Sequence, residues 1–502
     1  MKTFNYRNRQ SVTVFLMTLT IGVFSCQTDK LNPIPKTSIS DKVAFDSPDR
    51  VALQVNNLYT AVKSGQFLGG RYQIYGDIRS EDFINRTANG VTGYLVWNHT
   101  LTETSQNDVI NLWTAAYASI NQVNVFLQGM EDNKGKFVPP TFPSDFSTTA
   151  NQYIAEARFL RGLAYHCLLQ LYARPYIDGA GSKAGLPMRL NAEKNSLNND
   201  LARSSVAEVY PQIIADLDFA EANLPLTYSG ATLNVTRAHR NSAIALKTRV
   251  YLTKGDYANV ITEANKIVSA SAPFTAGSGV AHALQGNINT VFATPQETTE
   301  SIFSMPFTAQ NTPGTQNQLG FYYRSSSSSS TNPGGGEFSL NSSGIIADLV
   351  SFPSTDARRT NFVYKVGTEF FLGKYPSGTP YLDKAPILRY AEVLLNLSEA
   401  IAMTTAGVDS RSLALLNAVR TRSTGVTGTL APPDNATLIS NILTERRVEL
   451  IGEGLRNSDI MRFNLPFPGK GAVPSLPITS SIYAWPIPST ELAANALMTR
   501  NE

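Results

Sequence analysis

Three carboxylates stand close together in the run Gly76-Asp77-Ile-Arg-Ser-Glu81-Asp82. Acidic side chains this close can act as a general acid and base, or they can bind calcium. The spacing does not follow an EF-hand loop, and helix capping explains Asp and Ser at such a place without any chemistry. The sequence therefore favours a structural role for this run, and no metal site or cofactor is predicted.

A second group of charged residues lies near the C-terminus. Arg447 falls on the apolar side of a predicted helix, so its guanidinium needs a buried carboxylate partner. Glu392 and Glu399, on an earlier predicted helix, are both candidates, and the sequence leaves the choice open. We interpret the group as a structural motif rather than a catalytic one. Its other members are Glu445, Glu449, Arg456 and Asp459.

Aromatic side chains in irregular segments are candidates for contact with a ligand. Trp97 lies in a polar segment without helical periodicity, where a large ring is hard to bury. Pyranose rings present flat C–H faces that pack on an indole, and an Asn amide can bind vicinal hydroxyls. A second aromatic group borders the low-complexity tract 325–336, a predicted flexible loop, and would equally suit anchoring of that loop. The predicted ligand-binding residues are Tyr75 (in segment 66–82, interpreted as a Gly- and Tyr-rich loop), Tyr94, Trp97, Asn98, Phe321, Tyr322 and Tyr323.

The elements that would position these residues are mostly helices. Apolar residues recur at helical spacing in several stretches, and segment 245–258 resembles a tetratricopeptide unit with a Lys-Gly-Asp-Tyr turn between paired helices. One such unit cannot bury its face alone, so stacked neighbours are expected. The fold class is mainly α, with tetratricopeptide-like helix pairs forming a superhelical scaffold and a loop-rich irregular region that carries short strands. Helices are predicted from Ser47-Pro48 and within 113–124, 153–172, 204–224, 236–268 and 389–462.

Five motifs in order along the chain resemble the SusD/RagB family of outer-membrane lipoproteins, which capture nutrients for a TonB-dependent transporter. The resemblance implies a protein built around tetratricopeptide-like helix pairs that binds glycans or peptides without cleaving them. The charged motifs would then hold the scaffold together and need not touch ligand. The motifs are Glu-Ala-Arg-Phe-Leu-Arg (156–161), the run 389–400, Asn-Ala-Val-Arg-x-Arg (417–422), Glu-Arg-Arg-x-Glu-Leu (445–450) and Glu-Gly-x-Arg-x-x-Asp-Ile-x-Arg (453–462).

The N-terminus is predicted to be a targeting signal. Basic residues up to Arg9 precede an apolar run, 12–24, that is too short to span a bilayer. The run ends at Ser25-Cys26, which resembles a lipobox, so Cys26 is the predicted lipidation site; an ordinary signal peptide with a chance cysteine is the alternative. We expect a signal peptide (1–25), a lipid anchor and tether (26–41), an N-terminal helical scaffold (42–270), a loop-rich ligand-side region (271–386) and a C-terminal helical region (387–502).

Composition and the absence of certain motifs exclude several classes of function. The first 25 residues hold three basic and no acidic residues, so removing them takes the net charge from +3 to zero, and no nucleic-acid partner is expected. Two cysteines give no disulfide framework. No Gly-x-Ser-x-Gly, His-Glu-x-x-His or P-loop motif is present, so the chain is not expected to be an enzyme.

With the resemblance, these observations predict a cell-surface, lipid-anchored, glycan-binding protein of the outer membrane. It would capture oligosaccharides and deliver them to a TonB-dependent, SusC-like transporter. The alternatives are a peptide-binding member of the same family and a glycoside hydrolase, which needs only two carboxylates.

Overall fold

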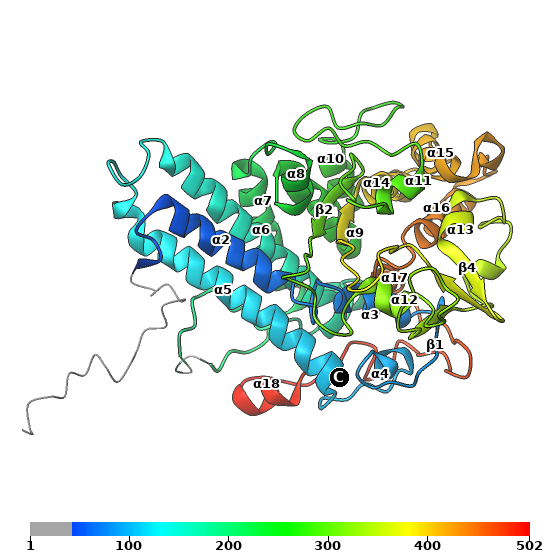
Figure 1. Ribbon diagram of the computed structural model, residues 1–502, viewed down its shortest axis with the longest axis horizontal. Coiled ribbons are helices and arrows are strands. Elements are labelled where there is room, and N and C mark those ends of the chain that lie inside the picture. The colour runs from blue at the N-terminus through cyan, green and yellow to red at the C-terminus, as the bar shows by residue number, and fades with distance from the viewer. Residues whose placement is uncertain (1–42, 196, 198, 502) are drawn as a thin grey trace, which may run out of the picture.

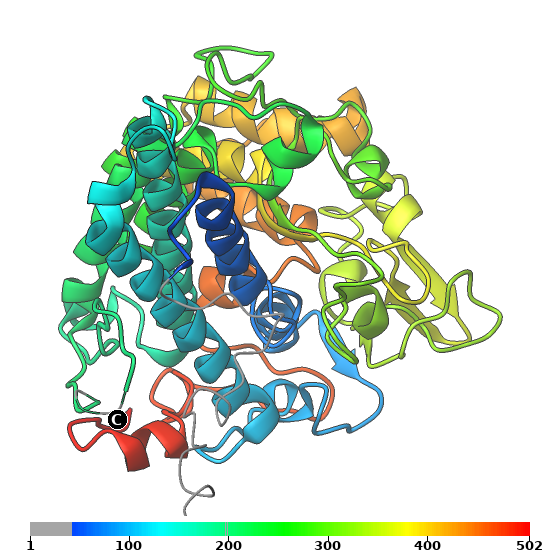
Figure 2. The same ribbon diagram turned by 60° about the vertical axis from the view of Figure 1, so that its left-hand side comes forward.

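The structure, a computed structural model, describes residues 43–195, 197 and 199–501. The first long helix, α2 (Pro48–Val62), begins where Ser47-Pro48 predicts, with the Ser47 side chain accepting a hydrogen bond from the backbone N–H of Arg50. Its apolar stripe packs against α5 (Asn111–Asn133) and α6 (Phe146–Tyr172), and Figure 2 shows these helices side by side. The predicted Cys26 lipidation site lies outside the described residues.

Helices that follow one another along the chain pack side by side, so that each buries the apolar face of the one before it. The succession runs from α5 to α6, then α7, α9, α10 and α14, with α15 and α16 packed on α14 (Figure 1). Gly255, in the left-handed conformation at φ +79°, ends α9, and Asp256 caps α10, so the predicted helix pair is present. These helices are α7 (Val206–Asn223), α9 (Arg240–Lys254), α10 (Tyr257–Ala264), α14 (Tyr390–Thr404), α15 (Ser410–Thr424) and α16 (Asn435–Glu449).

The irregular region between α10 and α14 carries five short strands, and one more, β1, lies between α3 (Arg71–Ile78) and α4 (Tyr94–Trp97). A four-stranded antiparallel sheet has the order β1-β3-β5-β4, and β2 pairs with β6 in a second, two-stranded sheet. The mainly α fold, with paired helices and short strands, is therefore confirmed. The strands are β1 (Phe83–Asn85), β2 (Ser301–Met305), β3 (Phe338–Leu340), β4 (Val363–Val366), β5 (Glu369–Leu372) and β6 (Ala385–Arg389).

Short helices complete the described chain. They are α3 (Arg71–Ile78), α4 (Tyr94–Trp97), α8 (Ala231–Thr236), α11 (Ile288–Phe292), α12 (Leu319–Tyr323), α13 (Ala357–Phe362), α17 (Arg456–Met461) and α18 (Ser489–Ala494). A π-helical segment, Gln106–Ile110, leads into α5, and 3-10 turns occupy Lys134–Lys136, Asp178–Gly181, Ile345–Ala347 and Val426–Gly428.

The prediction that segment 66–82 is a loop is wrong, because it contains α3. Every residue of this helix is buried, so it has no polar face and shows no amphipathic period in the sequence. Its backbone lies directly against the turn that follows α16. A Cβ on Gly76 would lie 2.0 Å from the carbonyl oxygen of Gly454, and one on Gly454, at φ +83°, 2.4 Å from the Cα of Gln73. Only glycine at both positions permits this contact.

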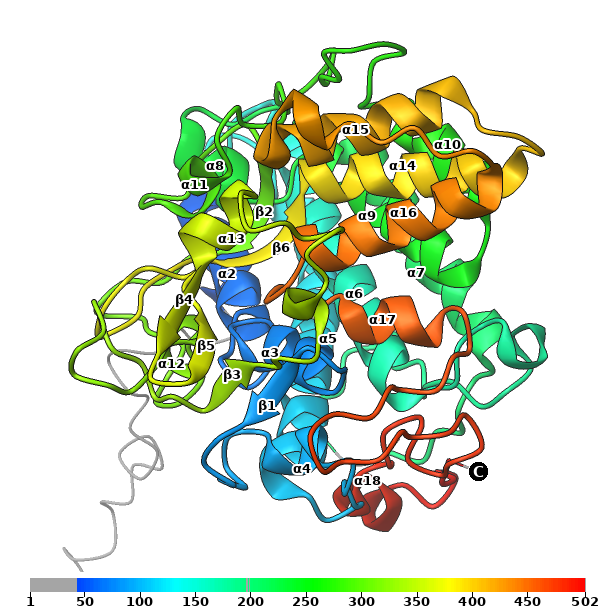
Figure 3. The same cartoon turned by 90° about the vertical axis from the view of Figure 1, so that its right-hand side faces the viewer.

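One continuous apolar core extends from Val51 on α2 to Met498 near the C-terminus, and it includes residues of both sheets. Figure 3 shows the C-terminal helices α14, α15 and α16 stacked above α17, with the small sheet and α12 beside them. Within the described residues, no helix combines the length and the apolar character needed to cross a membrane.

Candidate ligand-binding site

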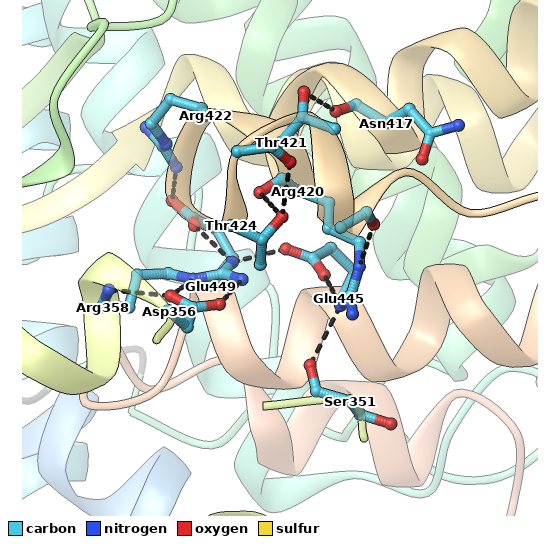
Figure 4. Close-up of polar contacts among 12 residues, drawn as sticks. Ser351, Asp356, Arg358, Asn417, Arg420, Thr421, Arg422, Thr424, Glu445 and Glu449 are labelled. Atoms are coloured by element: carbon cyan, nitrogen blue, oxygen red, sulfur yellow. Dashed lines mark hydrogen bonds and ion pairs between the residues drawn. The ribbon is translucent and has the colours of Figure 1, made fainter. Parts of the chain in front are cut away.

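A buried network of ion pairs surrounds two glutamates of α16. Glu449 lies 3.0 Å from Arg358, 2.9 Å from Arg389 and 2.6 Å from Arg422, while Glu445 pairs with Arg358 and Arg420 (Figure 4). Burial alone would raise the pKa of Glu449, but the guanidinium groups of Arg422, Arg389 and Arg358 outweigh it and hold that pKa well below its usual value. The network therefore joins α16 to α13, α15 and β6.

The same network continues toward the centre of the molecule. Arg389 also pairs with Glu300 and Glu453 at 2.7 Å each, and the buried ammonium of Lys374 lies 2.7 Å from Glu453. All of these side chains are shielded from solvent, so a ligand cannot reach their carboxylates. The arrangement holds helices and strands together, and it offers no accessible acid–base pair.

Arg447 pairs with neither of the carboxylates expected from the sequence. It donates to Asp82 through Nε (2.7 Å) and Nη2 (2.6 Å), and its Nη2 lies 3.1 Å from Glu81. Glu392 pairs instead with Arg249, and Glu399 with Arg462. The close contact between α3 and the turn after α16 brings the acidic run to Arg447. Helical periodicity within α16 cannot predict this pairing, because it depends on a segment far away in the sequence.

Each carboxylate of the acidic run thus has a structural partner. Glu81 also lies 2.6 Å from Arg456, and Asp77 accepts a hydrogen bond from the backbone N–H of Gly454 at 2.9 Å. In the C-terminal charged motif, Asp459 lies 3.1 Å from Arg446. Among the described residues, no three or more His, Cys, Asp or Glu side chains group as metal ligands would.

Asp77 makes the stability of the fold decrease as pH rises from about 4 to about 8. Its burial raises the pKa of this carboxyl from its usual value to about 8 in the folded protein. The folded state therefore keeps the proton while the unfolded chain loses it, so stability is greatest below the unfolded pKa, near 4, and falls as pH rises through about 8. We expect Asp77→Asn, which keeps the acceptor for Gly454, to be more stable than the parent at pH 8 by ~1–3 kcal/mol.

The two proteins are compared by urea unfolding between pH 5 and 9. Their difference in free energy of unfolding should grow with pH. A difference that is constant across this range would contradict a protonated Asp77.

Four of the predicted ligand-binding rings are buried, which corrects their assignment. Tyr75, Tyr322 and Tyr323 are 0% exposed and Trp97 is 8% exposed. The indole Nε1 of Trp97 donates to the carbonyl of Phe83 at 2.8 Å, and the ring of Tyr322 stacks on Phe338. Strands β1 and β3, which are far apart in sequence, contact Trp97, Tyr322 and Tyr323, whereas Tyr75 packs against Trp485, so none of the four rings is free for a ligand.

Tyr94, Asn98 and Phe321 remain accessible. The amide of Asn98 makes no side-chain hydrogen bond within the part of the chain that the structure describes. Phe321 packs edge-on against Tyr381, with ring centres 6.1 Å apart, and against Gly335, where a Cβ would lie 2.4 Å from its ring. We call Tyr94, Asn98, Phe321 and the half-buried Tyr381 the aromatic rim. Tyr381 was missed because it lies in a Ser-, Gly- and Pro-rich stretch without periodicity.

Arg71 joins the two parts of the rim. From α3 it donates to the carbonyl of Val91 (2.6 Å), just before α4, and to Asn317 Oδ1 (2.7 Å), just before α12. Its Nη1 also donates to Tyr75 at 2.7 Å, whereas Nη2 makes no hydrogen bond within the described residues. Arg71 thus fixes both segments. Arg71 was not predicted as a site residue because the segment that forms α3 was interpreted as a loop.

Family models, relatives and solved structures of SusD-type proteins match this chain. Residues 31–252 match a family described as starch-binding and associating with the outer membrane, and residues 360–472 match the SusD family. A crystal structure of a SusD superfamily protein from Bacteroides fragilis is 30% identical, with a TM-score of 0.78 over 91% of this chain and 99% of that one. SusD-like protein P2 of Formosa agariphila is 24% identical over 98% of this chain and 99% of its own. A laminarin-binding SusD-like protein is 21% identical, with a TM-score of 0.69 over 91% of this chain and 99% of that one.

Proposed function

Because the chain belongs to the SusD/RagB family, we propose that it captures oligosaccharides at the cell surface and delivers them to a TonB-dependent outer-membrane transporter. The observation that carries the proposal is the aromatic rim, held by Arg71 at the edge of a rigid scaffold. The family description, starch-binding and associated with the outer membrane, supports both the ligand class and the location.

The chemistry of the rim suits a sugar. Partly exposed phenyl and phenol rings offer flat faces to pyranose C–H groups, and the Asn98 amide can donate to one hydroxyl while it accepts from its neighbour. A SusD-like protein of the same fold binds laminarin. Affinity would come mainly from stacking, with hydrogen bonds selecting the sugar.

We further propose that the protein binds its ligand without cleaving it. The conspicuous carboxylates of the charged motifs are buried and paired with arginines, which supports binding over hydrolysis. Lipidation at Cys26 would hold the protein at the membrane, since several acyl chains anchor a protein stably. The mature chain, with no net charge, is in keeping with a neutral ligand.

Removing a rim ring should weaken glycan binding. We expect Tyr94→Ala and Phe321→Ala each to raise the Kd about tenfold, because each loses one stacking contact worth about 1–1.5 kcal/mol. Calorimetric titration of the protein from Gln27 onward measures this. Tyr251→Ala on α9, a partly exposed tyrosine away from the rim, is the matched control and should leave the Kd unchanged. Equal affinity in all three variants would show that the rim is not the binding site.

A further inference from the structure

A groove runs between α2 and α5, at the end of the molecule opposite the small sheet and α12 (Figure 1). Its volume is about 550 Å³, which is within the range of ligand pockets. Neither the charged motifs nor the aromatic rim extends to this groove.

The floor of the groove is apolar and carries one accessible aromatic ring. Leu58 and Phe126 are buried beneath it, and Phe45 lies half-buried at one end with its ring centre 6.1 Å from that of Phe126. Gly129 makes room for the Phe45 ring, since a Cβ at this position would lie 2.2 Å from it. The ring is therefore seated against α5.

Three amides line the groove with hydrogen-bonding capacity to spare. Within the described residues, Gln54, Asn57 and Gln122 make no side-chain hydrogen bond, although all three line the groove. Their neighbour Asn121 differs, because its amide accepts from and donates to the backbone of Glu193, both at 2.9 Å. Gln54 and Asn57 stand three residues apart on α2, so both side chains lie on the same side of that helix.

We propose that this α2–α5 groove is a second site for a neutral oligosaccharide, an inference that rests on the glycan-binding function proposed above. A seated phenyl ring beside unpaired amides is the combination that also makes the rim suitable for sugars. The charged residues at its edge, Asp132 and Lys194, are of opposite sign, so the groove has no net charge to select an ionic ligand. This balance favours a glycan over a charged peptide.

Two sites at opposite ends of one molecule would bind a long glycan chain bivalently. The second contact would then be intramolecular, which raises the affinity for a polysaccharide above that for a short oligosaccharide. The groove would thus hold a polymer on the protein while the rim selects the segment to be delivered.

The test measures how many oligosaccharide molecules bind to one molecule of the full mature chain. Native mass spectrometry with laminari-, malto-, xylo- and manno-oligosaccharides should show two bound molecules per protein for the oligosaccharide that binds. The double variant Asn57→Ala/Gln122→Ala should retain one, and affinity for the parent polysaccharide should fall about tenfold or more. Gln212→Ala, which removes a partly exposed amide on α7 that does not line the groove, is the control and should retain both.

The outcomes separate this inference from the proposed function. One bound molecule that is lost in Phe321→Ala and kept in Asn57→Ala/Gln122→Ala would overturn the groove site and leave the rim in place. One bound molecule that is lost only in the groove variant would support the groove and refute the rim. Peptide binding that displaces no oligosaccharide but is lost in the groove variant would overturn the inference.

Discussion

Replacing Glu449 with alanine is expected to lower the free energy of unfolding by about 3–5 kcal/mol, because it leaves three buried guanidinium groups without a shared carboxylate. Urea unfolding at pH 7 measures the change. The pKa of Glu449 is held below its usual value, so its contribution is present above the ordinary glutamate pKa of about 4.3 and is lost as pH falls through the lower folded value. The difference between parent and variant should therefore shrink only in acid.

The control for this prediction is an exposed ion pair. Glu103 pairs with Arg500, whose side chain is 69% exposed, and such surface pairs contribute at most about 1 kcal/mol. Glu103→Ala should therefore change stability little. Equal losses in the two variants would contradict a stabilising role for the buried network.

Substituting lysine for Arg71 is expected to weaken glycan binding by about tenfold to a hundredfold, or roughly 1.4–2.8 kcal/mol. Lysine keeps the charge, but it cannot donate at once to Val91, Tyr75 and Asn317, so both segments of the aromatic rim lose their common support. Calorimetric titration gives the Kd, and thermal unfolding of the same samples shows how much stability is lost.

A matched variant separates positioning of the rim from general loss of stability. Arg161 on α6 is also buried, and its guanidinium donates two hydrogen bonds to Asp216 on α7, at 2.8 and 2.7 Å. It has no contact with the rim. Arg161→Lys should lower the Tm and leave the Kd unchanged. If both variants change the Kd equally, Arg71 has no particular role in binding.

The sequence predicts long helices whose apolar residues recur at helical spacing. Helix α2 buries a single apolar stripe, and α6 and α14, although buried on nearly every side, are long enough for their apolar residues to repeat at that spacing. In α3 all residues are buried, and its contact partners lie nearly 400 positions away, as in the bond from Gly454 to Asp77. That helix, and with it Arg71, could not be recognised from local pattern.

The same reason limits prediction of the candidate site. Residue type pointed to aromatic segments, but the exposure of each ring depends on what covers it. Phe83 and Phe338, on strands that pair across more than 250 residues, bury Trp97 and Tyr322, whereas Tyr94 and Phe321 stay accessible. The partner of Arg447 was missed similarly, because it depends on the backbone contact between Gly76 and Gly454. Long-range packing therefore decides which aromatic rings are exposed and which carboxylate pairs with Arg447.

Glycan capture is tested most directly by calorimetric titration of the chain from Gln27 onward with plant, microbial and host oligosaccharides and with mixed peptides. We expect saturable heat with one class of neutral glycan and none with peptides. Saturable binding to peptides alone would contradict glycan capture and would assign this protein to peptide capture on the same scaffold.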